Sequence, residues 1–316
     1  MASRSIIAIW LAALACAPLA AQEPLPDELV LEGDNTVTIV VGGIPLRFEV
    51  SADPFGAPLI NPEIAAQLML MLERRRGWRF GPVTVDGVEA TLAADFGDGP
   101  VPLPFAWTRA RASDKADGVI GIQSLPHKRV TFRFHDEVEG ESVQRFALRR
   151  AGGRNNTRIG TEVKVGKKTL MMIFAAQRRE NLVTAPTANF IATHREGGFE
   201  PGTEGVAVMN FSVLRPTRTM RIADPILLGD LALERFAVRI EDYGDPRQVG
   251  DIAPDDPRFS KDHILVSRRK GRGSPDLLTR IGRDQIAHCS AITYDFAAEE
   301  IRLSCAVPTS AESAVR

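Results

Sequence analysis

A strand–turn–strand pattern occurs twice in this 316-residue chain, and it limits the fold more than any other feature. Each copy has two β-type runs around a glycine turn, then a polar turn, an apolar pair and the start of a short helix. Each copy closes with an apolar run that includes glycine and with a further β-type segment. The corresponding parts are residues 37–50 and 160–174, 59–62 and 182–186, 117–121 and 280–284, and 130–134 and 292–303. Two copies of one supersecondary pattern predict two similar units within one chain.

Short β-type runs separated by glycine and proline fill most of the sequence, which contains 26 Gly and 21 Pro. The best helical segment is Asn61 to Arg76. Asn61 can cap this helix, Pro62 suits its first position, and Gly77 suits its end. The pattern predicts a mainly β fold with few, short helices.

The first residues have the features of a secretory signal. Arg4 supplies a positive charge, Ile6 to Ala15 is an apolar run, and small residues follow at Ala20-Ala21. This arrangement predicts a signal peptide over residues 1–21 that is cleaved after Ala21, with Ala20 as the neighbouring choice. Alternatives are an uncleaved anchor or buried helix, and lipidation at Cys16, which follows small residues. We therefore expect an exported protein, periplasmic or secreted.

Two cysteines remain after such a cleavage, Cys289 and Cys305. Two β-type runs around a tight turn separate them and place them nearly opposite each other. In an oxidising compartment such a pair is expected to form a disulfide, and the alternative is two buried free thiols. No cluster of Cys and His has the spacing of a zinc site, so we expect neither metal nor cofactor.

The charge balance argues against nucleic acid as a partner, because 39 Lys and Arg face 40 Asp and Glu. No transmembrane segment is predicted in the mature chain. The copies meet near residues 149–156, where glycine, asparagine and arginine indicate an exposed linker. We expect two domains over residues 28–150 and 155–306, a tail over 307–316, and surface loops over 245–258 and 267–273.

The order of these elements resembles one lobe of the pepsin/retropepsin superfamily of aspartic proteases, repeated over residues 35–305. The strands 44–50 and 170–174 match the strand that precedes the catalytic turn in that family. The resemblance implies two pseudo-symmetric aspartic-protease-type β-barrel lobes, each of retropepsin-like length, with a groove between them.

The resemblance fails at the catalytic turns. The family has Asp-Thr/Ser-Gly after each of these strands, whereas this chain has Ser51-Ala52-Asp53 and Ala175-Ala176-Gln177. Two carboxylates that share a proton are needed for the family's chemistry. Ser51 and Ala175 occupy the expected aspartate positions, so we expect no catalytic residue. One alternative is a shifted register in which Asp53 works with Glu180.

The expected groove residues are those of the two turns and one aromatic residue of the middle β region: Ser51, Ala52, Asp53, Trp107, Ala175, Ala176 and Gln177. The leading hypothesis is a non-catalytic pseudo-protease that binds an extended peptide or a protein in this groove. A divergent aspartic-type peptidase or hydrolase with relocated acids is one alternative. An envelope structural or assembly protein is the other.

Overall fold

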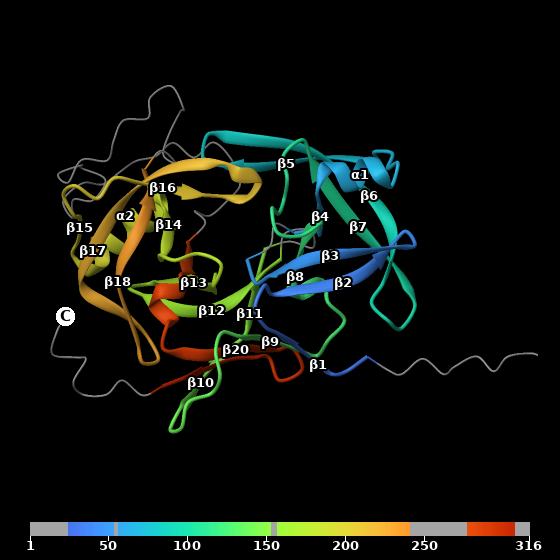
Figure 1. Ribbon diagram of the computed structural model, residues 1–316. Helices are drawn as coiled ribbons and strands as arrows, with labels where there is room; N and C mark the ends of the chain where they lie inside the picture. Colours follow the sequence, from blue (N-terminus) through green and yellow to red (C-terminus); the bar gives the residue numbers. More distant parts are fainter. Residues whose placement is uncertain (1–24, 54–55, 153–156, 241–276, 307–316) are drawn as a thin grey trace, which may run out of the picture.

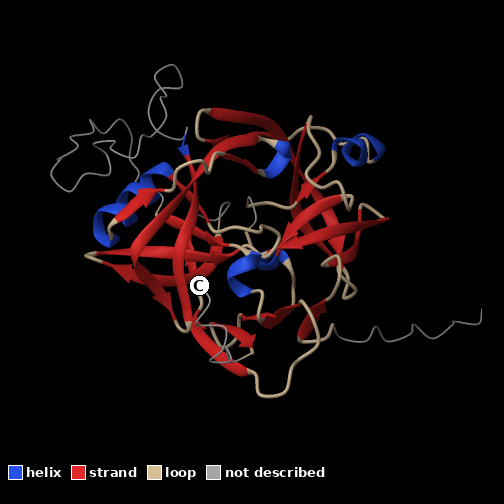
Figure 2. Ribbon diagram, turned by 60° about the vertical axis from the view of Figure 1, so that its left-hand side comes forward, coloured by secondary structure: helices blue, strands red, loops and turns tan. Residues whose placement is uncertain are grey.

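The computed structural model describes residues 25–53, 56–152, 157–240 and 277–306, and strands make up most of this part of the chain (Figures 1 and 2). The predicted mainly β fold is confirmed. The α-helices of the described residues are α1 (Pro62–Gln67) and α2 (Ala185–Arg195). The predicted signal peptide, Cys16, the loops at 245–258 and 267–273 and the tail at 307–316 lie outside the described residues.

The N-terminal sheet has the strand order β2-β3-β8-β4-β7-β6-β5. Its second strand, β3, alternates buried apolar and more exposed positions, as expected for a strand with one face on the core. Its strands are β2 (Thr36–Val41), β3 (Ile44–Ser51), β4 (Leu59–Ile60), β5 (Arg74–Phe80), β6 (Val83–Asp95), β7 (Pro100–Thr108) and β8 (Gly118–Gly121).

The C-terminal sheet has the order β11-β12-β13-β19-β14-β18-β17-β15, and β16 pairs with β17 outside this path. Its strands are β11 (Arg149–Ala151), β12 (Arg158–Val165), β13 (Lys168–Phe174), β14 (Leu182–Thr184), β15 (Gly197–Phe199), β16 (Gly205–Val208), β17 (Leu214–Leu228), β18 (Leu231–Arg239) and β19 (Leu278–Ile281). The β13 strand is buried along most of its length, in agreement with its continuous apolar run.

The two sheets share one strand order and the same strand directions. In the first, β3 pairs parallel with β8, β8 antiparallel with β4, and β4 parallel with β7. In the second, β13 pairs parallel with β19, β19 antiparallel with β14, and β14 parallel with β18. The sequence repeat therefore corresponds to a repeated topology, while the domain limits drawn from the sequence stay a prediction.

A third sheet contains strands from both halves of the chain, in the order β1-β9-β20-β21-β10. Its strands are β1 (Glu28–Leu31), β9 (Arg129–Arg133), β10 (Ser142–Ala147), β20 (Cys289–Asp295) and β21 (Glu300–Cys305). The β9–β20 and β10–β21 pairings are antiparallel and join the two halves. We call this the shared sheet.

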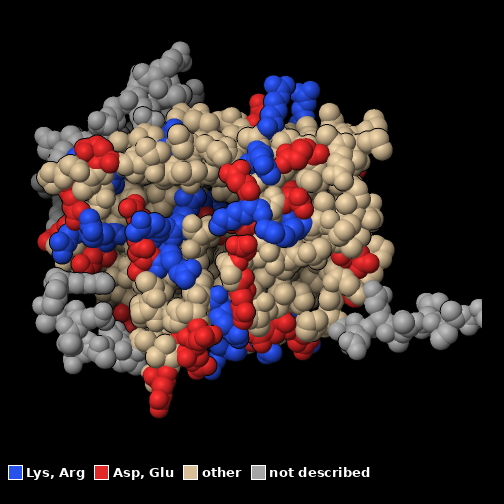
Figure 3. Space-filling model, in the orientation of Figure 1, with Lys and Arg blue, Asp and Glu red and all other residues tan. Residues whose placement is uncertain are grey.

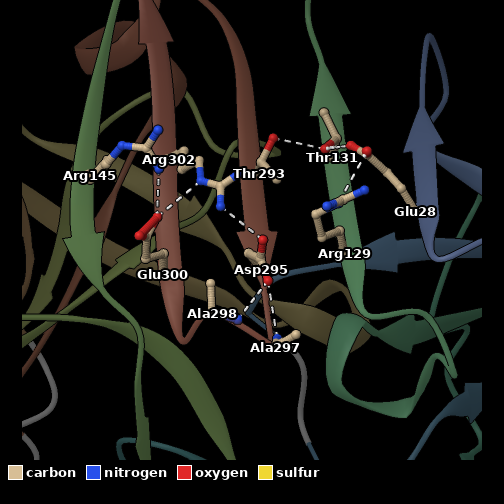
Figure 4. A network of polar contacts seen from close by, with 10 residues as sticks. All are labelled: Glu28, Arg129, Thr131, Arg145, Thr293, Asp295, Ala297, Ala298, Glu300 and Arg302. Carbon is tan, nitrogen blue, oxygen red and sulfur yellow. Dashed lines mark hydrogen bonds and ion pairs between the residues drawn. The ribbon is translucent and has the colours of Figure 1, made fainter.

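Polar side chains connect neighbouring strands of the shared sheet (Figure 4). Thr131 Oγ1 lies 2.8 Å from Thr293 Oγ1, between β9 and β20. Arg145 Nη1 on β10 donates to Glu300 Oε2 on β21 at 2.8 Å. Arg302 Nη2 donates to Asp295 Oδ2 at 2.9 Å and joins the two strands of the β20–β21 hairpin. The first two of these contacts bond strands of the first half to strands of the second.

The predicted disulfide is confirmed. Cys289 and Cys305 are register partners at one end of the β20–β21 pair, with their Cα atoms 3.7 Å apart, and their sulfurs are bonded. His288 has a ring nitrogen within 4.8 Å of both sulfurs. A disulfide offers no thiolate to a metal ion, so this group is not a metal site in its oxidised form.

The helix predicted over Asn61–Arg76 was too long. The α1 helix ends at Gln67, and Met69 adopts a positive φ of 49°. Arg74 to Gly77 instead form part of β5, where they pair in antiparallel register with Asp86 to Glu89 of β6. The alternate residues Trp78 and Phe80 of β5 are buried, and burial of this period-2 pattern outweighs the helical pattern of the segment. The expected linker also contributes a strand, since β11 pairs with β12.

The core extends through all three sheets as one large cluster of buried apolar side chains. Tyr294 and Phe48 are among its largest fully buried members, and they come from the shared sheet and the N-terminal sheet. In the described part of the chain, no helix is long and apolar enough to cross a membrane.

Candidate functional site

The strand registers identify which residues of the two halves correspond. Ser51, at the end of β3, lies opposite Gly121 of β8. Phe174, at the end of β13, lies opposite Ile281 of β19. The residues that directly follow these two strands are Ala175 and Gly282, so Ala175 corresponds to Ser51 and Gly282 corresponds to Gly121. The backbone N–H of Ala175 donates to the carbonyl of Ile281 at 2.9 Å. By the same count Asp53 corresponds to Gln177.

The two turns meet each other. Gln177 Nε2 donates to Ser51 Oγ at 3.1 Å, across the boundary between the halves. The same Oγ accepts the backbone N–H of Asp53 at 3.1 Å. Ser51 is 9% exposed and Ala175 is fully buried. The two positions at which the resemblance led us to expect aspartates therefore hold a hydroxyl group, fixed by an amide, and a methyl group.

Asp53 reaches from the first turn to β19 of the C-terminal sheet. Its Oδ2 lies 2.5 Å from Nε of Arg280, and its Oδ1 lies 3.3 Å from Nη2 of the same side chain. The two side chains are 4% and 7% exposed. This two-point geometry matches the fork of a guanidinium against a carboxylate. A buried ion pair thus joins the two halves directly beside Ser51 and Gln177.

The charge of Asp53 is fixed by its surroundings. Burial acts to raise the pKa of its carboxyl group. The charge and hydrogen bonds of Arg280 act in the opposite direction, and Arg178 and Arg158 add smaller effects. Together these cations outweigh burial and hold the pKa below its ordinary value. An aspartate with a lowered pKa stays ionised at neutral pH. It therefore lacks the exchangeable proton that general acid catalysis requires.

Arg178 and Tyr294 complete the surroundings of the ion pair. Burial lowers the pKa of Arg178 to about 10, and repulsion by Arg280 acts in the same direction. Arg178 Nη1 donates to the carbonyl of Val208 at 2.9 Å. Burial, together with the charge of Asp53, raises the pKa of Tyr294 far above its ordinary value, so its phenol stays neutral. Its hydroxyl lies 3.4 Å from the carbonyl of Phe174.

The other predicted site residues are placed differently. Ala52 is buried and Ala176 is half-buried within the two turns. Glu180 is exposed, and Asp53 contacts Arg280 rather than Glu180. Trp107 is half-buried and lines a cavity next to α1, apart from the two turns. The geometry brings Ser51, Asp53 and Gln177 together, but it brings neither Glu180 nor Trp107 to them.

Aromatic side chains of two hairpins meet beside this site. Trp78 and Phe80 come from β5 of the N-terminal sheet, and Phe211 comes from the short helical turn Asn210–Ser212 between β16 and β17. The rings of Trp78 and Phe211 have centroids 5.0 Å apart, and those of Phe80 and Phe211 lie 6.3 Å apart. With Met209 they form a buried apolar cluster between the two sheets. We call Trp78, Phe80, Met209 and Phe211 the hairpin cluster.

Sequence reasoning missed Arg280 and the hairpin cluster. A signal for Arg280 exists, because the apolar run before Gly282 contains an arginine where the run before Gly121 has Val119. A cation in a run that is otherwise buried indicates a buried anionic partner. The hairpin cluster has no such local signal, since its members come from segments more than 100 residues apart.

No protein-family model matches the chain, and no curated protein matches its sequence. Among solved structures, it is similar to a retropepsin-like aspartic protease from Rickettsia conorii, with 15% identity and a TM-score of 0.23 over 28% of this chain. The chain spans 66% of that protein, less than two thirds of its length. It is also similar to EIAV protease complexed with the inhibitor HBY-793, with 10% identity and a TM-score of 0.24, over 29% of this chain and 86% of that one. The described part of the chain has a mainly β fold. This statement concerns the fold alone.

Proposed function

We propose that this chain is an exported, non-catalytic protein of the aspartic-protease-type fold that binds an extended peptide segment. The observation that carries the proposal is the buried Asp53–Arg280 pair, which occupies the junction of the two turns with an ionised carboxylate and its cation. Hydrolysis by this fold needs two carboxylates that share a proton, and the turns offer only one. The disulfide of the shared sheet agrees with an oxidising compartment.

The division into two pseudo-symmetric lobes belongs to the same proposal, and the repeated strand order of the two large sheets supports it. The junction between these lobes would be a fixed structural contact. Trp78 and Phe211 add a further contact between the two halves.

The edge of β16 is the part of this region that best suits a peptide. Among described residues β16 pairs only with β17, and its Val206 and Val208 are 62% and 59% exposed. Pro216 lies opposite Val206 and has no N–H, so we infer that the N–H of Val206 points to the open edge. Arg178 already binds the carbonyl of Val208 at this edge, and the part around Val206, with its apolar side chain, favours the addition of a peptide strand.

One experiment tests both parts of this proposal. An unfolded, disulfide-free model protein is incubated with the purified chain from about pH 3 to 8, and both its cleavage and its binding are measured. We expect binding without cleavage, and we expect Val206→Pro to weaken binding about tenfold or more, since it removes an N–H from the open edge.

The matched control is Val206→Thr, which keeps the N–H and should bind as the parent does. Cleavage that disappears in Asp53→Asn or Glu180→Gln would contradict the non-catalytic part. Absence of binding, or equal binding by Val206→Pro, would contradict the peptide-binding part.

A further inference from the structure

A cavity of about 690 Å³ lies beside α1, between that helix and the N-terminal sheet. Three of its residues form one row across the sheet, because Arg75 of β5 pairs with Val88 of β6, and Val88 pairs with Trp107 of β7. Residues that are opposite in register present their side chains on the same face of a sheet. The volume is within the range of sites that hold small molecules, about 300–1,000 Å³.

The wall formed by α1 and the segment after it is apolar and unusually exposed. Ala66, Met69, Leu70 and Leu72 line the cavity, and Met69 and Leu72 are 85% and 60% exposed. Water contact with large apolar side chains is unfavourable, and an apolar ligand that covered them would be stabilised in proportion to the apolar surface removed from water. Methionine adapts its shape readily to such a ligand.

Arginines dominate the charge at this cavity. Arg75, Arg76 and Arg109 line it, whereas Asp86 is its one acidic residue. Arg76 is engaged, because its Nε lies 2.5 Å from Glu89 Oε2. For Arg75 and Arg109, both exposed, the described part of the chain shows no ion pair. In Figure 3, basic side chains project from the side of the molecule where β5 and α1 lie in Figure 1.

We propose that this cavity binds a long-chain carboxylate, whose alkyl chain lies along Trp107, Val88 and the α1 wall and whose head group meets Arg75 and Arg109. An apolar floor with a cationic rim is complementary to a molecule that has one apolar and one anionic end. A guanidinium binds a carboxylate through two parallel hydrogen bonds. This site is separate from the two turns and from the edge of β16, so it does not depend on the proposed function.

Calorimetric titration of the full chain with decanoate, below the concentration at which decanoate forms micelles, tests the proposal. We expect saturable binding of decanoate and binding at least tenfold weaker for decanol and for butyrate. Decanol keeps the chain without the charge, and butyrate keeps the charge without the chain. The double variant Arg75→Gln/Arg109→Gln should weaken decanoate binding at least tenfold, and Ala66→Trp should do the same by filling the exposed helix side of the cavity.

Arg79→Gln is the matched control, since Arg79 is an exposed arginine of the same strand that does not line the cavity. It should leave decanoate binding unchanged. Equal affinity of the parent and the Arg75/Arg109 variant for decanoate would overturn the proposal. So would tighter binding of an acidic, apolar peptide than of decanoate, which would reassign the cavity to a peptide.

Discussion

Replacing Asp53 with asparagine should lower the free energy of unfolding by about 3–5 kcal/mol, as measured by urea denaturation at neutral pH. The substitution keeps the shape of the side chain and removes its charge. Arg280 would then be a buried cation without its carboxylate, and its loss of hydration would no longer be offset. This cost is expected because the pair is buried and contacts at two points, unlike the ion pairs at the surface.

An exposed ion pair of similar distance provides the comparison. Arg133 Nη1 and Glu32 Oε1 are 2.6 Å apart, but their side chains are 47% and 60% exposed. Glu32→Gln should therefore cost about 1 kcal/mol or less. The double variant Asp53→Leu/Arg280→Met should regain most of the stability lost in Asp53→Asn, because it leaves no buried charge. A cost for Asp53→Asn as small as that for Glu32→Gln would contradict the structural role of the pair.

The stability difference between the parent and Asp53→Asn also depends on pH in a defined way. The pKa of Asp53 is lowered in the folded chain, so its contribution to stability is present above its unfolded pKa and is lost as the pH falls through the folded pKa. The difference in stability between the parent and Asp53→Asn should thus be constant above about pH 5 and should shrink progressively as the pH falls below that value.

Trp78→Ala should destabilise the chain by about 3–5 kcal/mol, because it removes a large buried ring between the two large sheets. Trp78 is 6% exposed and contacts Phe211, which is 5% exposed. A double-mutant cycle with Trp78→Leu and Phe211→Leu should give a coupling energy of about 0.5–1.5 kcal/mol, the range of aromatic pairs. Urea denaturation measures both the loss of stability in Trp78→Ala and the coupling energy of the cycle.

Leu214→Ala is a suitable control for this cycle, since Leu214 begins β17 next to the hairpin cluster but is 62% exposed. It should change the free energy of unfolding by about 0.5 kcal/mol or less. A coupling energy near zero between Trp78 and Phe211 would show that the two hairpins do not hold each other in solution.

The repeat in the sequence predicted two similar β-rich units because it consists of local signals. Alternating apolar residues, glycine turns and the apolar pairs at 59–60 and 182–183 each act within a few residues. In the structure Ser51 and Ala175 occupy equivalent places in the two sheets, since each adjoins the glycine that follows an isoleucine of a parallel neighbour. The disulfide was predictable for the same reason, because the two cysteines flank a single hairpin.

The contacts of the site were not predictable, because they join residues far apart in the chain. Asp53 and Arg280 are 227 positions apart, and Gln177 and Ser51 are 126 apart. The sequence showed that Asp53 was out of place for a catalytic aspartate, but not that a cation would meet it. The end of α1 was misjudged for a related reason, since Arg74 to Gly77 fit either a helix end or a strand until the pairing of β5 with β6 decides.

A structural carboxylate that is held in its ionised form must have a lowered pKa, so the side-chain pKa of Asp53 is the quantity to measure. The chain is labelled with ¹³C at aspartate carboxyl groups, the Asp53 signal is assigned by its absence in Asp53→Asn, and its chemical shift is followed from pH 8 downward by NMR. We predict that Asp53 stays ionised below pH 3.8, the ordinary value of an aspartate, or until the chain unfolds in acid. A midpoint above that value, or a titration in two steps shared with a second carboxyl group, would show a proton-sharing site and contradict the account.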